Sequence, residues 1–264
     1  MPDIQELNPF PPPTSGSQSA GSPGEDEEGS LKGVIIGLLA FAAAEEQMLL
    51  AAAPAAEPGS AQCWAAVPLV AHTTEFKRQQ VQRLQAIGRG EVPPEFGEID
   101  HASGELYRGY AGLPADEVAA DSRAVTGELI AGVHAAGADD LRDPSRHPWL
   151  RGRQLWLQVI VRGFWHPAGH LGEYYLGHGR ADRAVALAGH GVATASYLGA
   201  PGPARGMASY NLACALARAG RLDQAAAALR EAVMLNPDVR ANARRDPDLA
   251  ALRDSGRLEA ALAP

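Results

Sequence analysis

Long segments whose apolar residues recur at the spacing of an α-helix constrain this fold more than any other feature of the chain. We predict helices at about residues 31–53, 65–87, 114–137 and from 151 up to Gly179. The sequence GRGEVPPEFGEIDHASGELYRGYAGLP makes a long connection between the second and third of them. Because four helices with one long crossover are typical of a bundle, we expect an all-α fold.

Composition bears on nucleic-acid binding, membrane insertion and cellular location. The net charge of −8 argues against unspecific binding to nucleic acid, which needs a basic surface. The most apolar run, Gly33–Ala44, has about twelve residues, whereas a membrane helix needs about twenty, so we expect a core helix and no membrane span. Two cysteines without a CxxC motif, and an N-terminus without a basic signal region, favour a cytoplasmic protein.

The chain divides into three predicted parts. Residues 1–29 are rich in Pro, Ser and Gly and predict a disordered tail. Residues 30–178 form the predicted bundle, and residues 179–264 form a region of helical hairpins. The hairpins are indicated by two similar segments 41 residues apart, Leu171–Ala188 and Leu212–Leu229, which both read helix, Gly-Arg-x-Asp-x-Ala, helix.

The second of these segments has small and large residues at the positions of a tetratricopeptide (TPR) hairpin. The positions are Leu212, Ala213, Leu216, Gly220, Ala225, Leu229 and Ala232. This resemblance implies TPR-like hairpins that end in a capping helix, and such hairpins commonly present a surface to a protein partner.

The fourth predicted helix contains the pair His166 and His170 in the sequence HPAGH. Histidines at i and i+4 project from one side of a helix, about 6 Å apart, and can reach one cation. Both lie on the predicted inward face, and His72 lies on the inward face of the second helix. We expect the three imidazoles to converge, with nitrogens within about 4 Å of one another, as a catalytic-type metal site requires. The alternative is a set of core histidines satisfied by hydrogen bonds.

Together, PLVAHTTEF on the second helix and HPAGH on the fourth resemble the DinB-like superfamily, over about residues 31–178. That superfamily includes mycothiol-dependent maleylpyruvate isomerases, bacillithiol transferases and related hydrolases. The resemblance implies a four-helix bundle with a divalent metal, of the zinc, nickel or iron class, at His72, His166 and His170.

Several residues near the histidine pair have open roles. Pro167 removes a helical hydrogen bond and should kink the helix, which either aims His166 into the bundle or spoils the site. Glu173, seven residues after His166, is a fourth ligand, a partner that orients a histidine, or a surface charge. Trp165 and Tyr174 are candidates to line the pocket. No catalytic residue is assigned.

These observations predict a metal-dependent enzyme that acts on a small molecule. The resemblance implies either thiol-dependent transfer or isomerisation, or hydrolysis of an electrophile. Abundant alanine, glycine and arginine indicate a high-GC actinobacterial source, in which mycothiol would be the thiol cofactor. The alternative is a non-enzymatic protein-interaction module that uses its TPR-like hairpins.

Overall fold

The computed structural model describes residues 25–54, 57–60, 63–96 and 104–263, and over these residues the protein is all-α, as predicted. Among them there is no strand beyond an isolated bridge between Ser60 and Cys63. The contacts divide the chain into two compact units, with the division between His170 and Leu171. This division falls inside a helix and earlier than the boundary at residues 178 and 179 that the sequence predicts.

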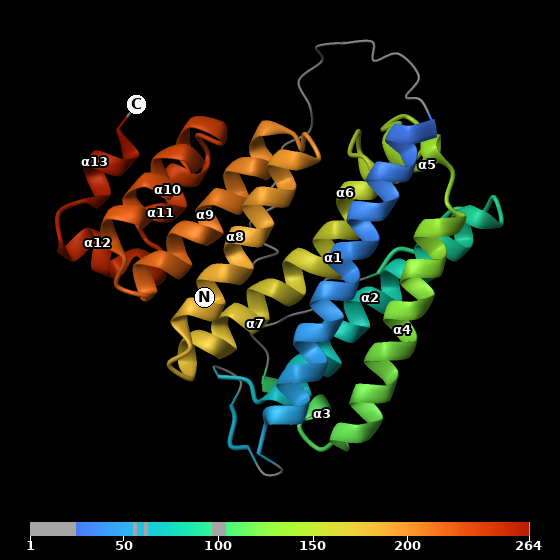
Figure 1. Ribbon diagram of the computed structural model, residues 1–264, viewed down its shortest axis with the longest axis horizontal. Coiled ribbons are helices and arrows are strands. Elements are labelled where there is room, and N and C mark those ends of the chain that lie inside the picture. Colours follow the sequence, from blue (N-terminus) through green and yellow to red (C-terminus); the bar gives the residue numbers. More distant parts are fainter. Residues whose placement is uncertain (1–24, 55–56, 61–62, 97–103, 264) are drawn as a thin grey trace. The chain divides into compact units, whose positions relative to one another are not determined.

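The first unit is built from four long helical segments and two short helices (Figure 1). Its elements are α1 (Glu25–Ala52), α2 (Ala66–Gly88), α3 (Gly104–Tyr110), α4 (Ala115–Ala135), α5 (Ala138–Arg142), the 3-10 turn Pro148–Leu150, α6 (Leu155–Ile160), the π-helical segment Val161–Trp165 and the start of α7 (His166–Gly177). The helices α1, α2 and α4 pack on one another, and α6 and the π-helical segment pack on α1. We call this packed set the bundle.

Two boundaries in the bundle differ from the prediction. The first helix begins at Glu25, inside the predicted tail. The last helix begins at Leu155 and not near 151, because Arg151 and Gly152 have positive φ angles that a right-handed helix cannot contain. Residues 1–24 of the predicted tail lie outside the described residues.

Helix α1 is the one described helix that is long and apolar enough, over Leu31–Ala52, to cross a membrane by length and composition. In the bundle it buries Ile35, Leu39 and Ala42 against its neighbours, and it also buries the carboxylate of Glu46. A charged residue is costly at the centre of a membrane helix. Helix α1 thus contributes apolar side chains and one carboxylate to the core of the bundle; the absence of a membrane span and a cytoplasmic location stay predictions.

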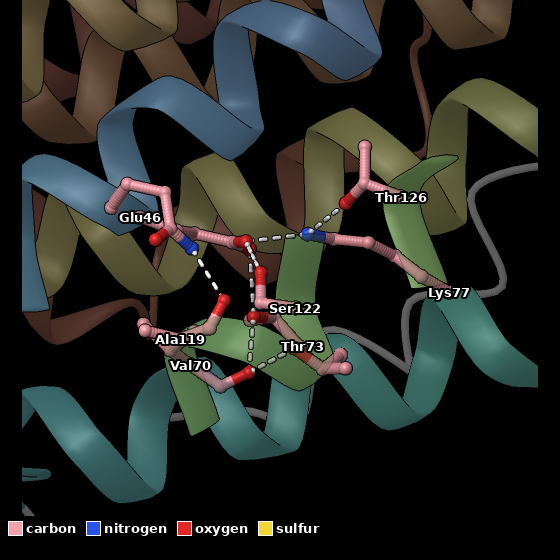
Figure 2. A network of polar contacts seen from close by, with 9 residues as sticks. Glu46, Val70, Thr73, Lys77, Ala119, Ser122 and Thr126 are labelled. Atoms are coloured by element: carbon pink, nitrogen blue, oxygen red, sulfur yellow. Dashed lines mark hydrogen bonds and ion pairs between the residues drawn. The ribbon is translucent and has the colours of Figure 1, made fainter. Parts of the chain in front are cut away.

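The core of the bundle contains an ion pair between Glu46 of α1 and Lys77 of α2, both fully buried (Figure 2). The Nζ atom of Lys77 lies 2.5 Å from Oε2 of Glu46, and the same oxygen accepts a hydrogen bond of 2.8 Å from Ser122 of α4. The other oxygen, Oε1, accepts 2.9 Å from the hydroxyl of Thr73, and Lys77 Nζ also lies 3.4 Å from Thr126 Oγ1. The network therefore fixes three helices in one register.

The second unit is a series of helices joined by short turns. Its elements are the remainder of α7, α8 (Ala181–Tyr197), α9 (Gly202–Arg218), α10 (Leu222–Leu235), α11 (Val239–Ala243), the 3-10 turn Pro247–Leu249, α12 (Ala250–Asp254) and α13 (Leu258–Leu262). Helix α9 packs on α8 and α10, and α10 packs on α13. The predicted capping helix is thus divided into short helices, since Gly256 adopts a positive φ of 72°.

The Gly-Arg-x-Asp segments predicted as turns are turns, at Gly179 and Gly220, with φ values of 69° and 74°. Successive turns are linked by ion pairs, Arg221 with Asp182 and Arg257 with Asp223. The TPR-like positions Ala213, Leu216, Ala225, Leu229 and Ala232 are buried in one core, and Leu212 packs against it. Helical hairpins are therefore confirmed, while their membership of the TPR class stays a prediction.

We predict that Lys77→Met lowers the free energy of unfolding by about 3–5 kcal/mol, because it leaves the Glu46 carboxylate buried without its counter-charge. Urea unfolding followed by circular dichroism measures this. The double variant Glu46→Leu/Lys77→Met should lose less than the sum of the two single variants. Lys32→Met, which removes one solvent-exposed hydrogen bond to the carbonyl of His134, is the control and should change stability by less than about 0.5 kcal/mol. A Lys77→Met loss no larger than that of the control would contradict the role given to the pair.

Candidate metal centre

The histidine cluster is assembled from two helices of the bundle. His72 lies in α2 and is fully buried, and His166 and His170 lie in the first two turns of α7, with His166 7% exposed. Each of the three offers one ring nitrogen, and the three nitrogens lie within 4.8 Å of one another. The Nε2 atoms of His72 and His166 are 3.2 Å apart. The predicted convergence of these residues is therefore present.

A π-helical segment explains how the proline is accommodated. Pro167 has no N–H group to donate, and its ring would meet the carbonyl of Gly163 in a regular α-helix. The chain widens over Val161–Trp165, and the N–H of His166 donates to the carbonyl of Val161, five residues earlier. The helix continues through Pro167, and His166 faces His72. The sequence left open whether Pro167 aims His166 into the bundle or spoils the site, and in the structure His166 points into the bundle.

Gly163 lets this widened turn approach the other helices closely. A Cβ atom on Gly163 would lie 2.2 Å from Cδ2 of Leu39 in α1 and 3.2 Å from Cδ2 of Leu129 in α4, and both leucines are buried. The space beside Gly163 thus belongs to apolar packing against α1 and α4. This packing supports the helix turn that carries His166.

Aromatic rings surround the three imidazoles. The Phe76 ring stacks on His166 at 4.1 Å between centroids and lies 5.0 Å from His72. The Trp64 ring, just before α2, lies 5.1 Å from His72 and 6.4 Å from His170. Such contacts restrict how the imidazoles rotate and keep water from their apolar edges. The rings therefore help to hold the nitrogen donors in place.

The long crossover adds rings from α3 to the aromatic rings around the imidazoles, which we call the aromatic wall. Tyr110 lies 6.2 Å from His72 between ring centroids, and Tyr107 lies 5.4 Å from Trp64. Burial and the charge of Glu75 raise the pKa of Tyr110 above its usual value, so its hydroxyl remains a hydrogen-bond donor at neutral pH. The crossover therefore connects α2 to α4 and also supplies aromatic rings beside the histidine cluster.

The segment before α2 holds these aromatic rings in position. Glu57 accepts a hydrogen bond of 2.7 Å from the N–H of Ala66 and so caps the first turn of α2. A Cβ atom on Gly59 would lie 2.5 Å from the hydroxyl of Tyr107 and 2.7 Å from the N atom of Ala65. Only glycine allows this close approach, which brings the crossover against the start of α2.

The donor set fits a divalent transition metal. Three neutral imidazoles are the ligands of catalytic zinc sites, and a tetrahedral ion with bonds of about 2.1 Å places their nitrogens about 3.4 Å apart. The 3.2 Å separation of His72 and His166 is close to that value. Imidazole also suits nickel and iron, so the residues do not select among the predicted metals.

Other predicted site residues have different surroundings. Trp165 makes none of the ring contacts to the cluster; its indole Nε1 is buried and has no hydrogen-bond partner among the described residues. Tyr174 belongs to the second unit, where its ring stacks on His178 at 4.0 Å. Their predicted place in a pocket stays a prediction. The aromatic residues beside the cluster, which the sequence did not single out for that role, are Trp64, Phe76 and Tyr110, and Tyr107 packs behind Trp64.

Glu173 also belongs to the second unit, and its role toward the histidines stays a prediction. Within that unit, burial and the negative charge of Asp248 raise the pKa of Glu173 to about 7, against an opposing effect of Arg218. Its Oε1 atom is buried and has no hydrogen-bond partner among the described residues. The side chain is therefore partly protonated at neutral pH.

Among the described residues of the first unit, no other histidine joins the cluster. His147 is buried, and its Nε2 lies 3.0 Å from the carbonyl of Asp140, which gives it a structural role. His134 and His190 are exposed on α4 and α8. His101 lies outside the described residues.

A second group of possible ligands, which the sequence did not indicate, lies in the second unit at Cys214, Asp246 and Asp248. Burial and the two carboxylates raise the pKa of Cys214 well above its usual value, which keeps the thiol protonated and a poor metal ligand. Asp246 already accepts 2.6 Å from the Tyr210 hydroxyl and 2.9 Å from the N–H of Asp248. The hydrogen bonds of Asp246 and the protonated thiol therefore explain this group by structure alone, without a metal ligand role.

No protein family, no curated protein and no solved structure matches this chain.

We predict that His72→Ala, His166→Ala and His170→Ala each remove most of the bound zinc, because two imidazoles seldom hold a divalent ion tightly. Mass spectrometry of metal content after dialysis against a weak chelator measures this. His134→Ala removes an exposed histidine from α4 and should leave the metal content unchanged. Equal zinc content in all four variants would contradict the assignment.

We predict that metal-free protein loses stability as the pH rises from about 4.5 to 7, partly through Glu173. The raised pKa means that the folded chain holds a proton that the unfolded chain releases, so stability falls over this interval. In Glu173→Gln that part of the pH dependence should be absent. Thermal unfolding at several pH values tests this, and an identical pH profile for variant and wild type would refute it.

Proposed function

We propose that the protein is a metal-dependent enzyme that acts on a small molecule at the His72, His166 and His170 cluster. The observation that carries the proposal is the convergence of two buried imidazoles and one half-buried imidazole, from two helices, among aromatic rings. A tetrahedral ion with three protein ligands keeps one position for water or substrate, which distinguishes catalytic from structural sites. When bound, the ion supplies Lewis acidity and lowers the pKa of a water or thiol at that position.

The residues of the chain orient the imidazoles and keep water from them. Phe76 stacks on His166 and fixes the plane of its imidazole, while Trp64 packs near His72 and His170. The hydroxyl of Tyr110, kept protonated by burial, can donate a hydrogen bond to a polar group of a substrate. The aromatic surroundings favour a substrate with an apolar part beside the atom that reacts.

The resemblance to the DinB-like superfamily directs the choice of reaction. It rests on His72 in the second helix, on the HPAGH pair, and on the long connection between α2 and α4. The proposed reactions are transfer or isomerisation with a low-molecular-weight thiol such as mycothiol, and hydrolysis of an electrophile. Both begin with a thiol or a water as nucleophile.

A second candidate function is that of a protein-interaction module. It is supported by the helical hairpins of the second unit and by two large apolar side chains exposed on them, Tyr197 at 70% and Met234 at 76%. An interaction module has no need of a metal. Stoichiometric metal in the purified chain therefore favours the enzyme over this alternative.

We predict that zinc-loaded protein accelerates either the conjugation of a thiol to a small electrophile or the hydrolysis of that electrophile. The assay follows loss of the thiol and of the electrophile separately, with mycothiol and with water alone. Chelation should abolish the activity and zinc should restore it, and His170→Ala should be inactive under both conditions. Activity that survives in His170→Ala would contradict the proposal.

A further inference from the structure

Beside the histidine cluster, the bundle contains three arginines that have no acidic partner among the described residues. Arg83 lies in α2, Arg153 precedes α6, and Arg162 lies in the π-helical segment. Over the described residues none of them forms an ion pair, although the surface arginines Arg78, Arg89 and Arg146 all do. The sequence drew no attention to these arginines as a group.

Arg83 is the most buried of the three, at 8% exposure. Its Nε and Nη1 atoms are buried and have no hydrogen-bond partner among the described residues. Its guanidinium lies 4.8 Å from the centroid of the Phe96 ring and 5.5 Å from that of Trp149. Stacking on aromatic rings covers the faces of a guanidinium and leaves the N–H donors at its edge available.

Arg162 and Arg153 are half-buried, so the group extends from the interior toward solvent. The Arg162 guanidinium lies 4.6 Å from the centroid of the Phe76 ring. Burial, together with the positive charges of Arg83 and Arg153, lowers the pKa of Arg162 to about 10. Arg153 makes one hydrogen bond, of 3.0 Å from Nε to the carbonyl of Leu150. The charge of Arg162 therefore lies close enough to those of Arg83 and Arg153 to be repelled by them.

This arrangement is costly in the absence of a counter-charge. A buried guanidinium loses hydration, and cation–π contacts offset only part of that loss. Gln80, between Phe76 and Arg83 on α2, adds to the cost, because it is fully buried and both amide atoms have no hydrogen-bond partner among the described residues. Unpaired donors and an unpaired amide in one region indicate a polar ligand that is anionic.

The group is next to the metal centre. Arg162 precedes His166 by four residues and His170 by eight, so it extends their stripe along the helix by one turn. A single ring, that of Phe76, contacts both the Arg162 guanidinium and the His166 imidazole. On α2, Arg83 follows Phe76 by seven residues, two turns along the same face.

We propose that Arg83, Arg153 and Arg162 form a binding site for the oxyanion of a small molecule, a carboxylate or a phosphate. The planar fork of arginine matches both groups in bidentate geometry. The anion site stands on the arginines themselves. Its use as the subsite that orients an anionic substrate toward the histidines rests on the proposed function.

The test measures the melting temperature of the full-length protein in phosphate, in acetate and in chloride at equal ionic strength. Phosphate or acetate should raise the melting temperature with increasing concentration, since a ligand that binds only the folded state stabilises it, and chloride should not. The response to phosphate compared with acetate distinguishes the two kinds of oxyanion. Titration calorimetry with the more effective anion gives its affinity.

Arg162→Met and Arg83→Met should each weaken anion binding at least tenfold and remove the rise in melting temperature. Without anion these variants should be no less stable than wild type, because they remove a desolvated charge. Arg162→Lys keeps the charge without the fork and should bind with intermediate affinity, and it serves where a methionine variant does not fold. Arg89→Met removes an exposed arginine from the end of α2 and should leave affinity within twofold.

An equal response in all variants, or no response to either oxyanion in wild type, overturns the anion site. Zinc content is measured on the same samples, and Arg162→Met should retain it. If wild type binds the anion but no metal, the anion site stands and the proposed function fails. If wild type binds zinc but no anion, the anion site fails and the proposed function stands.

Discussion

The wide helical turn over Val161–Trp165 is the feature on which the rest of the site depends. It allows a helix to continue through Pro167, and it turns His166 toward His72. A regular helix would place the carbonyl of Gly163 against the proline ring. The turn has a cost in helical hydrogen bonding, and the packing of Leu39 and Leu129 beside Gly163 compensates for part of it. Single π-turns inside α-helices frequently mark functional sites.

The bundle contains two kinds of buried polar group. One kind has ion-pair and hydrogen-bond partners, and the other has no ion-pair partner among the described residues. The Glu46 carboxylate has Lys77, Thr73 and Ser122 as partners, and so it fixes helices α1, α2 and α4 in register. Arg83 and Arg162 have aromatic rings as neighbours and, among the described residues, no carboxylate as ion-pair partner. A satisfied network stabilises a fold, whereas unsatisfied donors next to a possible metal centre indicate the chemistry of a ligand.

Much of this organisation could be predicted from helical spacing. The HxxxH spacing, together with the inward position of His72, indicated the cluster before any coordinates, and the Gly-Arg-x-Asp segments indicated the turns of the second unit. The aromatic wall could not be predicted, because Trp64 and Tyr110 reach His72 from a loop and from a crossover, whose paths have no periodicity. The arginine group was missed for a similar reason: its members are near one another in space but come from segments up to 79 residues apart, from Arg83 to Arg162.

The central claim is that three imidazoles hold one metal ion, and X-ray absorption of the zinc-loaded protein tests it most directly. The account predicts a first shell at about 2.0–2.1 Å with the multiple scattering of three imidazoles, and a fourth light ligand. Sulfur in the first shell, a shell of oxygen atoms alone, or a protein that retains no zinc at all would contradict it.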